Sequence, residues 1–246
     1  MKKTNYKYLN IKGAVLDNYQ LEQYMEKIAT SHDVELTSNI ATYPIPRLKD
    51  NYRFIEKTYD LLNKHIKMGI NLYPAGEWLL DNFYIIEETF KTVCKEMTIT
   101  KYKKLPGITT GMYKGFSRIY VVASEIVAYT DNKINDEILS MAISAYQRRK
   151  TLAMEEIWNL WIFLEIAIIE NIRNICEKIY SSQIQKYKVE SIIERLVEKK
   201  EANTQVFKPI KDEYKENVSY KEMKYPFIEY MSYKLKSTGK KGLPYL

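Results

Sequence analysis

The pattern of apolar and polar positions along the chain is helical almost throughout. Apolar residues recur at three- and four-residue spacing, which is typical of helices that bury one face. No stretch shows the strict alternation that would predict a ladder of strands. The pattern therefore predicts an all-α fold, an irregular multi-helix bundle or solenoid-like helical domain. The predicted helices cover residues 17–32, 46–68, 74–97, 116–129, 136–148, 152–180, 188–202 and 227–242.

One of these predicted helices is expected to form the centre of the bundle. The helix over 152–180 is apolar almost all round between Ile157 and Ile169, which is typical of a buried helix. We expect the helices that begin at Pro74 and Phe116 to contact it, and Thr151 to cap it. The chain is expected to divide into an N-terminal arm with one helix (1–45), a helical core domain (46–180) and a helical extension truncated at its C-terminus (181–246).

Composition and charge exclude few functions. Hydrophobic residues make up 46% of the chain and charged residues 28%, an ordinary balance for a folded protein. The net charge of +7 allows a nucleic-acid or membrane surface, but the lysines are spread over many helix faces, so solubility is the preferred interpretation. The start of the chain lacks the apolar region of a signal peptide, and the most apolar window, 161–169, is too short to span a bilayer. We expect a soluble, cytoplasmic chain.

The motifs that would indicate an active site are missing. The sequence has no GxGxxG or GxxxxGK[ST] loop for phosphate and no Asp-x-Asp pair to hold a metal on a diphosphate. Its two cysteines and two histidines show no metal-ligand spacing. The adjacent pairs 87–88 and 155–156 are glutamates that we interpret as solvated helix faces. We therefore predict no catalytic residue, no metal site and no cofactor.

One helix nevertheless carries a compact set of polar and aromatic side chains. Such a set could form a sugar-binding or catalytic cluster, or the polar edge of a packed helix. The structural alternative is favoured, because several arginines within apolar helices need carboxylate partners. The predicted structural polar cluster consists of Glu77, Trp78, Asp81, Asn82 and Arg118.

Arg118 is the expected partner of the carboxylates in this cluster. It follows a glycine-rich loop that would let its helix fold back on the helix from Pro74. We expect Arg118 to pair with Glu77 or Asp81. We also expect Trp78, Leu79 and Phe83 to be largely buried beneath this pair.

Several segments, taken together and in order, resemble a known family. They are NYRFIEKTYDLL, PAGEWLLDNFYIIEE, YKKLPGI, GFSRIYVVASEIVAYTDN, AYQ, LAMEEIWNL, IENIRNI and FIEYMSYKLKSTGKKGLPYL. This series is similar to the N-terminal region of the cyclic β-1,2-glucan synthases and the segment that follows it. The resemblance runs from about residue 17 to the end. It implies a family of large inner-membrane enzymes that polymerise glucose from UDP-glucose and cyclise the product.

The resemblance implies a helical, non-catalytic cytoplasmic part of such an enzyme, with no catalytic residue to assign. UDP-glucose and a divalent metal are implied for the full-length family, but no cofactor is expected for this part. The implied partners are the remaining domains of the synthase. The resemblance also allows contact with the cytoplasmic face of the membrane. The alternative is a free-standing helical interaction module that binds nucleic acid through its Lys- and Tyr-rich ends. We expect no nucleic-acid partner.

Overall fold

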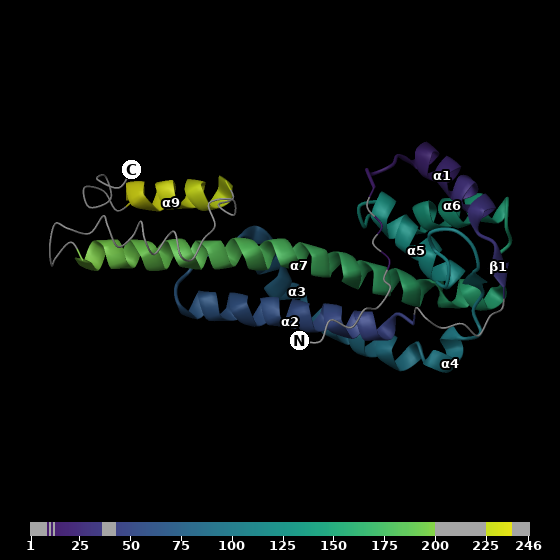
Figure 1. Ribbon diagram of the computed structural model, residues 1–246, viewed down its shortest axis with the longest axis horizontal. Coiled ribbons are helices and arrows are strands. Elements are labelled where there is room, and N and C mark those ends of the chain that lie inside the picture. Colours follow the sequence, from purple (N-terminus) through teal and green to yellow (C-terminus); the bar gives the residue numbers. More distant parts are fainter. Residues whose placement is uncertain (1–8, 10, 12, 36–42, 200–224, 238–246) are drawn as a thin grey trace. The chain divides into compact units, whose positions relative to one another are not determined.

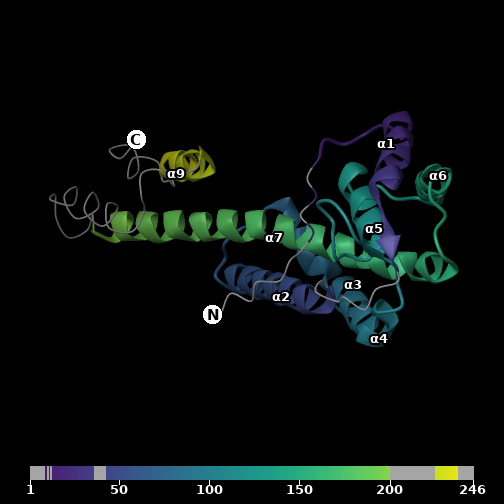
Figure 2. The same cartoon turned by 45° about the vertical axis from the view of Figure 1, so that its right-hand side comes forward.

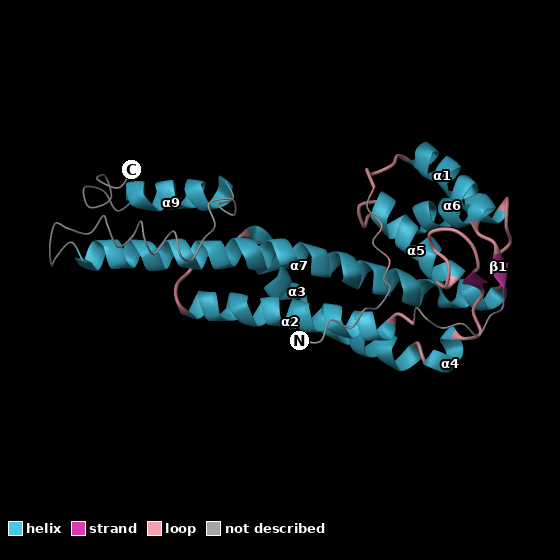
Figure 3. Cartoon of the chain, viewed as in Figure 1, coloured by secondary structure: helices cyan, strands magenta, loops and turns pink. Residues whose placement is uncertain are grey.

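The residues that the structure describes fold mostly into helices, as Figures 1 and 3 show. The computed structural model describes residues 9, 11, 13–35, 43–199 and 225–237. The all-α prediction is confirmed. The helices and strands are α1 (Asn18–Ser31), β1 (Val34–Glu35), α2 (Ile45–Lys67), α3 (Pro74–Glu96), α4 (Ile99–Tyr102), β2 (Gly107–Ile108), α5 (Arg118–Tyr129), α6 (Asp136–Gln147), α7 (Met154–Lys199) and α9 (Tyr225–Ser237).

Local sequence signals fix most helix starts. Asp17 precedes α1 and accepts from the Gln20 amide, while the Gln20 side chain accepts from the Asp17 amide, so the two form a capping box. Asn135 caps α6 through its side-chain oxygen. Pro74 begins α3, where its missing N–H costs nothing. These starts agree with the predicted ones to within two residues.

The predicted break after residue 180 is wrong. The helix predicted over 152–180 and the described part of the one predicted over 188–202, which reaches residue 199, form one continuous helix, α7, of 46 residues. The segment YSSQIQKYK between them contains no glycine or proline to stop a helix. Gln183, Lys186 and Val189 continue the buried face at helical spacing. Thr151 does not cap α7, because the first helical amide bonds run to the carbonyl of Ala153.

The loop between α3 and α5 contains more structure than the sequence predicted. It holds the short helix α4 and strand β2, which pairs antiparallel with β1 through Val34–Ile108 and Glu35–Gly107. Gly111 and Gly115 adopt φ values of 72° and 88°, which favour glycine and let the loop turn back toward α5. The strand pair ties the end of α1 to the start of α5.

The described residues group into two compact units. One comprises residues 1–56 and 82–174, and the other comprises 57–81 and 175–246. In the first, α1 packs against α6, and α5 lies beside the N-terminal part of α7 (Figures 1 and 2). Its core includes the fully buried Ile119, Tyr146 and Phe163. The predicted domain limits at 45 and 180 stay a prediction.

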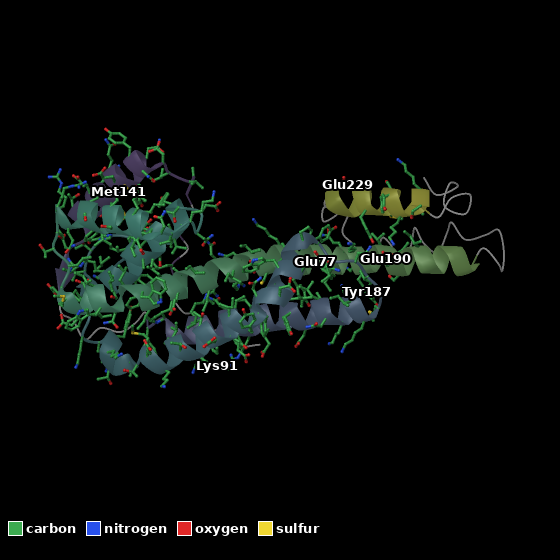
Figure 4. The ribbon with its side chains drawn as sticks, turned by 180° about the vertical axis from the view of Figure 1, so that it is seen from behind. Glu77, Lys91, Met141, Tyr187, Glu190 and Glu229 are labelled. Atoms are coloured by element: carbon green, nitrogen blue, oxygen red, sulfur yellow. The ribbon has the colours of Figure 1, made fainter. Side chains whose placement is uncertain are left out.

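The second unit is organised around the later turns of α7. The ring of His65 from α2 stacks on Tyr187 with centroids 5.5 Å apart. Glu190 accepts hydrogen bonds from Tyr230 and from Lys234 of α9, the latter at 2.8 Å (Figure 4). None of the described helices combines the length and the apolar composition needed to cross a bilayer.

Candidate functional site

The structure places the predicted cluster of α3 at the surface. Glu77 and Asp81 are exposed, and within the described residues neither forms an ion pair. Trp78 is 53% exposed, so the prediction that it is buried is wrong, whereas Leu79 is buried as predicted. Asn82 is half-buried. Figure 4 marks Glu77 on α3. The cluster therefore lacks the buried clasp that the sequence suggested.

The register of α3 explains this exposure. Leu79, Ile86 and Val93 recur every seven residues and are buried, so they define the face that packs inward. Trp78 is one residue away from that stripe and therefore rotated by about 100° around the helix. Phe83, which was predicted to be largely buried, lies at the edge of the stripe and is of intermediate burial. Periodicity alone did not show where the packed stripe ends.

Arg118 pairs with Glu156, so the predicted pairing with Glu77 or Asp81 is wrong. Its Nε donates to Glu156 Oε1 at 2.9 Å, and its Nη2 donates to Glu156 Oε2 and, at 3.1 Å, to the Thr151 carbonyl. Arg118 is 4% exposed and Glu156 is fully buried. The bidentate geometry is the strongest form of this pair and neutralises a charge that burial would otherwise disfavour.

Glu156 also caps the start of α7. Its Oε2 accepts a hydrogen bond from the backbone N–H of Ala153 at 2.8 Å. In a capping box, the glutamate three positions after the N-cap residue makes this contact. The prediction that Glu156 lies on a solvated face is therefore wrong. The sequence signal that could have identified this role is a glutamate three residues after the N-cap position of a helix.

A buried histidine lies close to this pair. The His32 Nδ1 and the Tyr146 Oη are 2.9 Å apart, and both side chains are buried. Burial lowers the pKa of His32 to about 4, helped by the positive charges of Arg118 and Lys150. Lys150 donates to the His32 carbonyl at 2.8 Å. His32 is therefore held as a neutral imidazole at pH 7.

A buried carboxyl without a cationic partner among the described residues forms the second part of this region. Glu125 is fully buried and accepts hydrogen bonds from the phenols of Tyr24, at 3.0 Å, and Tyr113. Burial raises the pKa of Glu125 above its usual range, and the two phenol hydrogen bonds only partly oppose this. The His32 and Tyr113 rings meet edge to face with centroids 6.1 Å apart, which brings the two parts together.

Together these residues form what we call the buried polar network, which joins α1, α5, α6 and α7. Its members are His32, Tyr146, Arg118, Glu156, Glu125, Tyr24 and Tyr113. Perturbed pKa values of this kind often mark active sites, but structural networks produce them too. Here most of the hydrogen-bond donors and acceptors of the network bond to one another. The network is therefore suited to hold helices in register.

Two hollows in the same unit are candidate ligand sites. One, of about 40 Å³, lies between α5 and α7 beside Glu170, whose carboxylate already pairs with Arg47 at 2.7 Å. The other is an open groove of about 500 Å³ along α1 and α6, where Arg148 and Arg149 pair with Glu26. Within the described residues no group of three or more histidine, cysteine or acidic side chains could hold a metal. The acidic side chains that line the two hollows, Glu22, Glu26 and Glu170, all pair with arginines.

The N-terminal half of α7 has an exposed aromatic face. Trp158 is 71% exposed and Trp161 is 65% exposed, so the prediction of a helix buried all round is wrong for these turns. The Trp161 Nε1 donates to Glu165 Oε1 at 2.9 Å, which fixes the ring. Apolar composition predicted burial all round, but in these turns Leu160, Ile162, Phe163 and Leu164 are buried while the two tryptophans are not.

Comparison with known proteins relates the chain to a curated synthase. No known protein-family profile matches the chain. It is 26% identical over 151 residues to the cyclic beta-(1,2)-glucan synthase NdvB of Rhizobium meliloti (strain 1021). That similarity covers 61% of this chain but only 5% of the relative, so the chain spans a small part of the relative's length. It indicates a distant relationship to this synthase.

Proposed function

We propose that the chain is a non-catalytic helical part of a cyclic β-1,2-glucan synthase-like protein, which polymerises glucose from UDP-glucose. The observation that carries the proposal is the similarity over 151 residues to the Rhizobium meliloti synthase. The order of the segments that resemble the N-terminal region of that family supports the same position in the longer protein. On this proposal the chain works at the cytoplasmic face of the membrane.

The chemistry of the described residues supports a non-catalytic role. Transfer of glucose from UDP-glucose needs groups that hold a diphosphate and its metal. Among the described residues, the buried Arg118 and Glu156 are instead paired with each other, and the buried carboxyl of Glu125 accepts hydrogen bonds from two phenols. On this proposal UDP-glucose and a divalent metal bind to other domains of the synthase, which are the partners of this chain.

A segment exchange in the Rhizobium meliloti synthase tests the proposal. The matched segment is deleted from that protein, and this chain is inserted in its place; reinsertion of the original segment is the control. Cyclic glucan is then measured in cells. We expect deletion to abolish glucan and insertion of this chain to restore a measurable part of it. Loss of glucan on deletion, with no recovery while the inserted chain is folded, would contradict the proposal.

The isolated chain provides a second test. Incubated with labelled UDP-glucose and Mg²⁺ or Mn²⁺, it is expected to incorporate no glucose. Incorporation that copurifies with the chain and is lost on its heat denaturation would show that it carries catalytic groups of its own. That result would contradict the non-catalytic role.

A further inference from the structure

We propose that the exposed aromatic face of α7, formed by Glu155, Trp158, Trp161 and Glu165, binds a glucan chain. This proposal rests on the proposed function, because the synthase relationship is what brings a glucan near the chain. It adds a ligand site to a part that we otherwise describe as structural. We call these four residues the tryptophan face.

The four residues follow one another along one side of the helix. Their spacings of three, three and four residues place each beside the next on the helix surface. The two indoles are largely exposed, and a carboxylate stands at each end, Glu155 exposed and Glu165 half-buried. The result is an aromatic strip with a hydrogen-bond acceptor at both ends.

One of the two rings is held in place before any ligand arrives. Trp161 donates its Nε1 hydrogen to Glu165, which restricts the rotation of the ring. Burial raises the pKa of Glu165, and the hydrogen bond from Trp161 partly offsets this. A fixed aromatic surface loses little conformational entropy on binding, which favours affinity. Exposed indoles of this size are also uncommon on a surface that contacts only water.

The charge of this half of α7 selects the class of ligand. The tryptophan face carries two glutamates and no lysine or arginine, and the other two glutamates between Lys150 and Arg173 already pair with Arg118 and Arg47. Nucleic acid and anionic lipid need cations, so they are disfavoured at this face. A second copy of the same face would bring like charges together.

A neutral polyhydroxylated chain fits both features. The apolar C–H faces of glucose rings can pack on the indoles, which supply large rigid contact surfaces. Their hydroxyl groups can donate to the carboxylates at the ends of the strip, and hydrogen bonds to ionised acceptors are the stronger kind. The glutamates therefore add to the binding of a sugar, whereas they would oppose an anion.

Intrinsic fluorescence offers a direct test, because the chain contains three tryptophans. The Trp78→Phe variant leaves only the two indoles of α7 as reporters. It is titrated with linear β-1,2-linked glucan oligosaccharides. We expect a saturable change in emission. In the same background, W158A and W161A should each weaken binding about tenfold, since each removes one aromatic contact.

Matched variants separate binding from folding. Trp78→Ala removes an exposed indole from α3 and should leave glucan binding, followed by calorimetry, unchanged. W161F keeps an aromatic ring and should retain more affinity than W161A. Circular dichroism of each variant is expected to match the parent protein, because the replaced rings lie at the surface.

Other outcomes would overturn the proposal. Absence of a glucan response in fluorescence, or calorimetric glucan binding that survives loss of both indoles, would do so. So would an emission shift with vesicles of phosphatidylcholine and phosphatidylglycerol but not with glucan, or a dimer that W158A dissociates. If the W158A–W161A chain still restored glucan in the segment exchange, the tryptophan face would fail as a functional site while the proposed function stood.

Discussion

Replacement of Glu156 by alanine is the sharpest test of the buried polar network. The change leaves Arg118, only 4% exposed, without a carboxylate and with only neutral partners, the Thr151 carbonyl at 3.1 Å and the Tyr146 phenol. Removing one partner of a buried ion pair costs about 3–5 kcal/mol. The amide of Ala153 also loses its acceptor, which costs about 1 kcal/mol more. The loss of roughly 4 kcal/mol or more is a large part of the 5–15 kcal/mol that stabilises a typical protein.

Urea unfolding followed by circular dichroism measures this loss, and amide hydrogen exchange localises it. We expect lower protection in α5 and in the first turns of α7. Glu155→Ala is the matched control: it removes a neighbouring, exposed glutamate from the same turn and should change the free energy of unfolding by at most about 1 kcal/mol. Equal effects of the two replacements would refute the structural role given to Glu156.

Three further changes probe separate parts of the structure. In the folded protein the pKa of His32 is lowered from 6.5 to about 4. The contribution of neutral His32 to the free energy of unfolding is therefore complete above pH 6.5, and about 3 kcal/mol of it is lost as the pH falls toward 4. His32→Asn should flatten this pH dependence, measured by urea unfolding at a series of pH values. Glu125 has a raised pKa, so its ionisation opposes folding as the pH rises; Glu125→Gln should raise the melting temperature at pH 8 more than at pH 5, and an equal change at both would contradict this. Asp81→Ala should shift the free energy of unfolding by less than about 0.5 kcal/mol, because Asp81 is exposed, and a loss above 2 kcal/mol would show a partner that the structure lacks.

Helix positions were predictable from the sequence because local signals determine them. Asp17, Asn135 and Pro74 act through their own backbone neighbourhood, so their effect can be inferred without tertiary contacts. The continuation of α7 past residue 180 was missed for a related reason. A polar stretch can remain helical when other helices cover its face, as happens around Gln183 and Lys186.

Partners of charged residues were much harder to predict. Glu155 and Glu156 are adjacent, yet one faces water and the other is fully buried against Arg118. Neighbouring helical residues point about 100° apart, so one of two glutamates can face inward, and the sequence does not say which. For the same reason Trp78 was wrongly predicted to be buried, and the exposure of Trp158 was not predicted. Burial depends on which helices pack together, and that is not a local property.

Glucan production by a segment-exchanged synthase tests most directly whether the chain contributes structure and not chemistry. The Rhizobium meliloti synthase carrying this chain is compared with the same protein bearing E156A or the double replacement R118M–E156L. Apolar replacement of both partners removes the charges without stranding either of them, and such replacements are often neutral or stabilising. We expect little glucan from the synthase with E156A and recovery of glucan production with R118M–E156L. A double variant that is folded and makes no glucan would contradict this expectation, because the charged groups themselves would then be required.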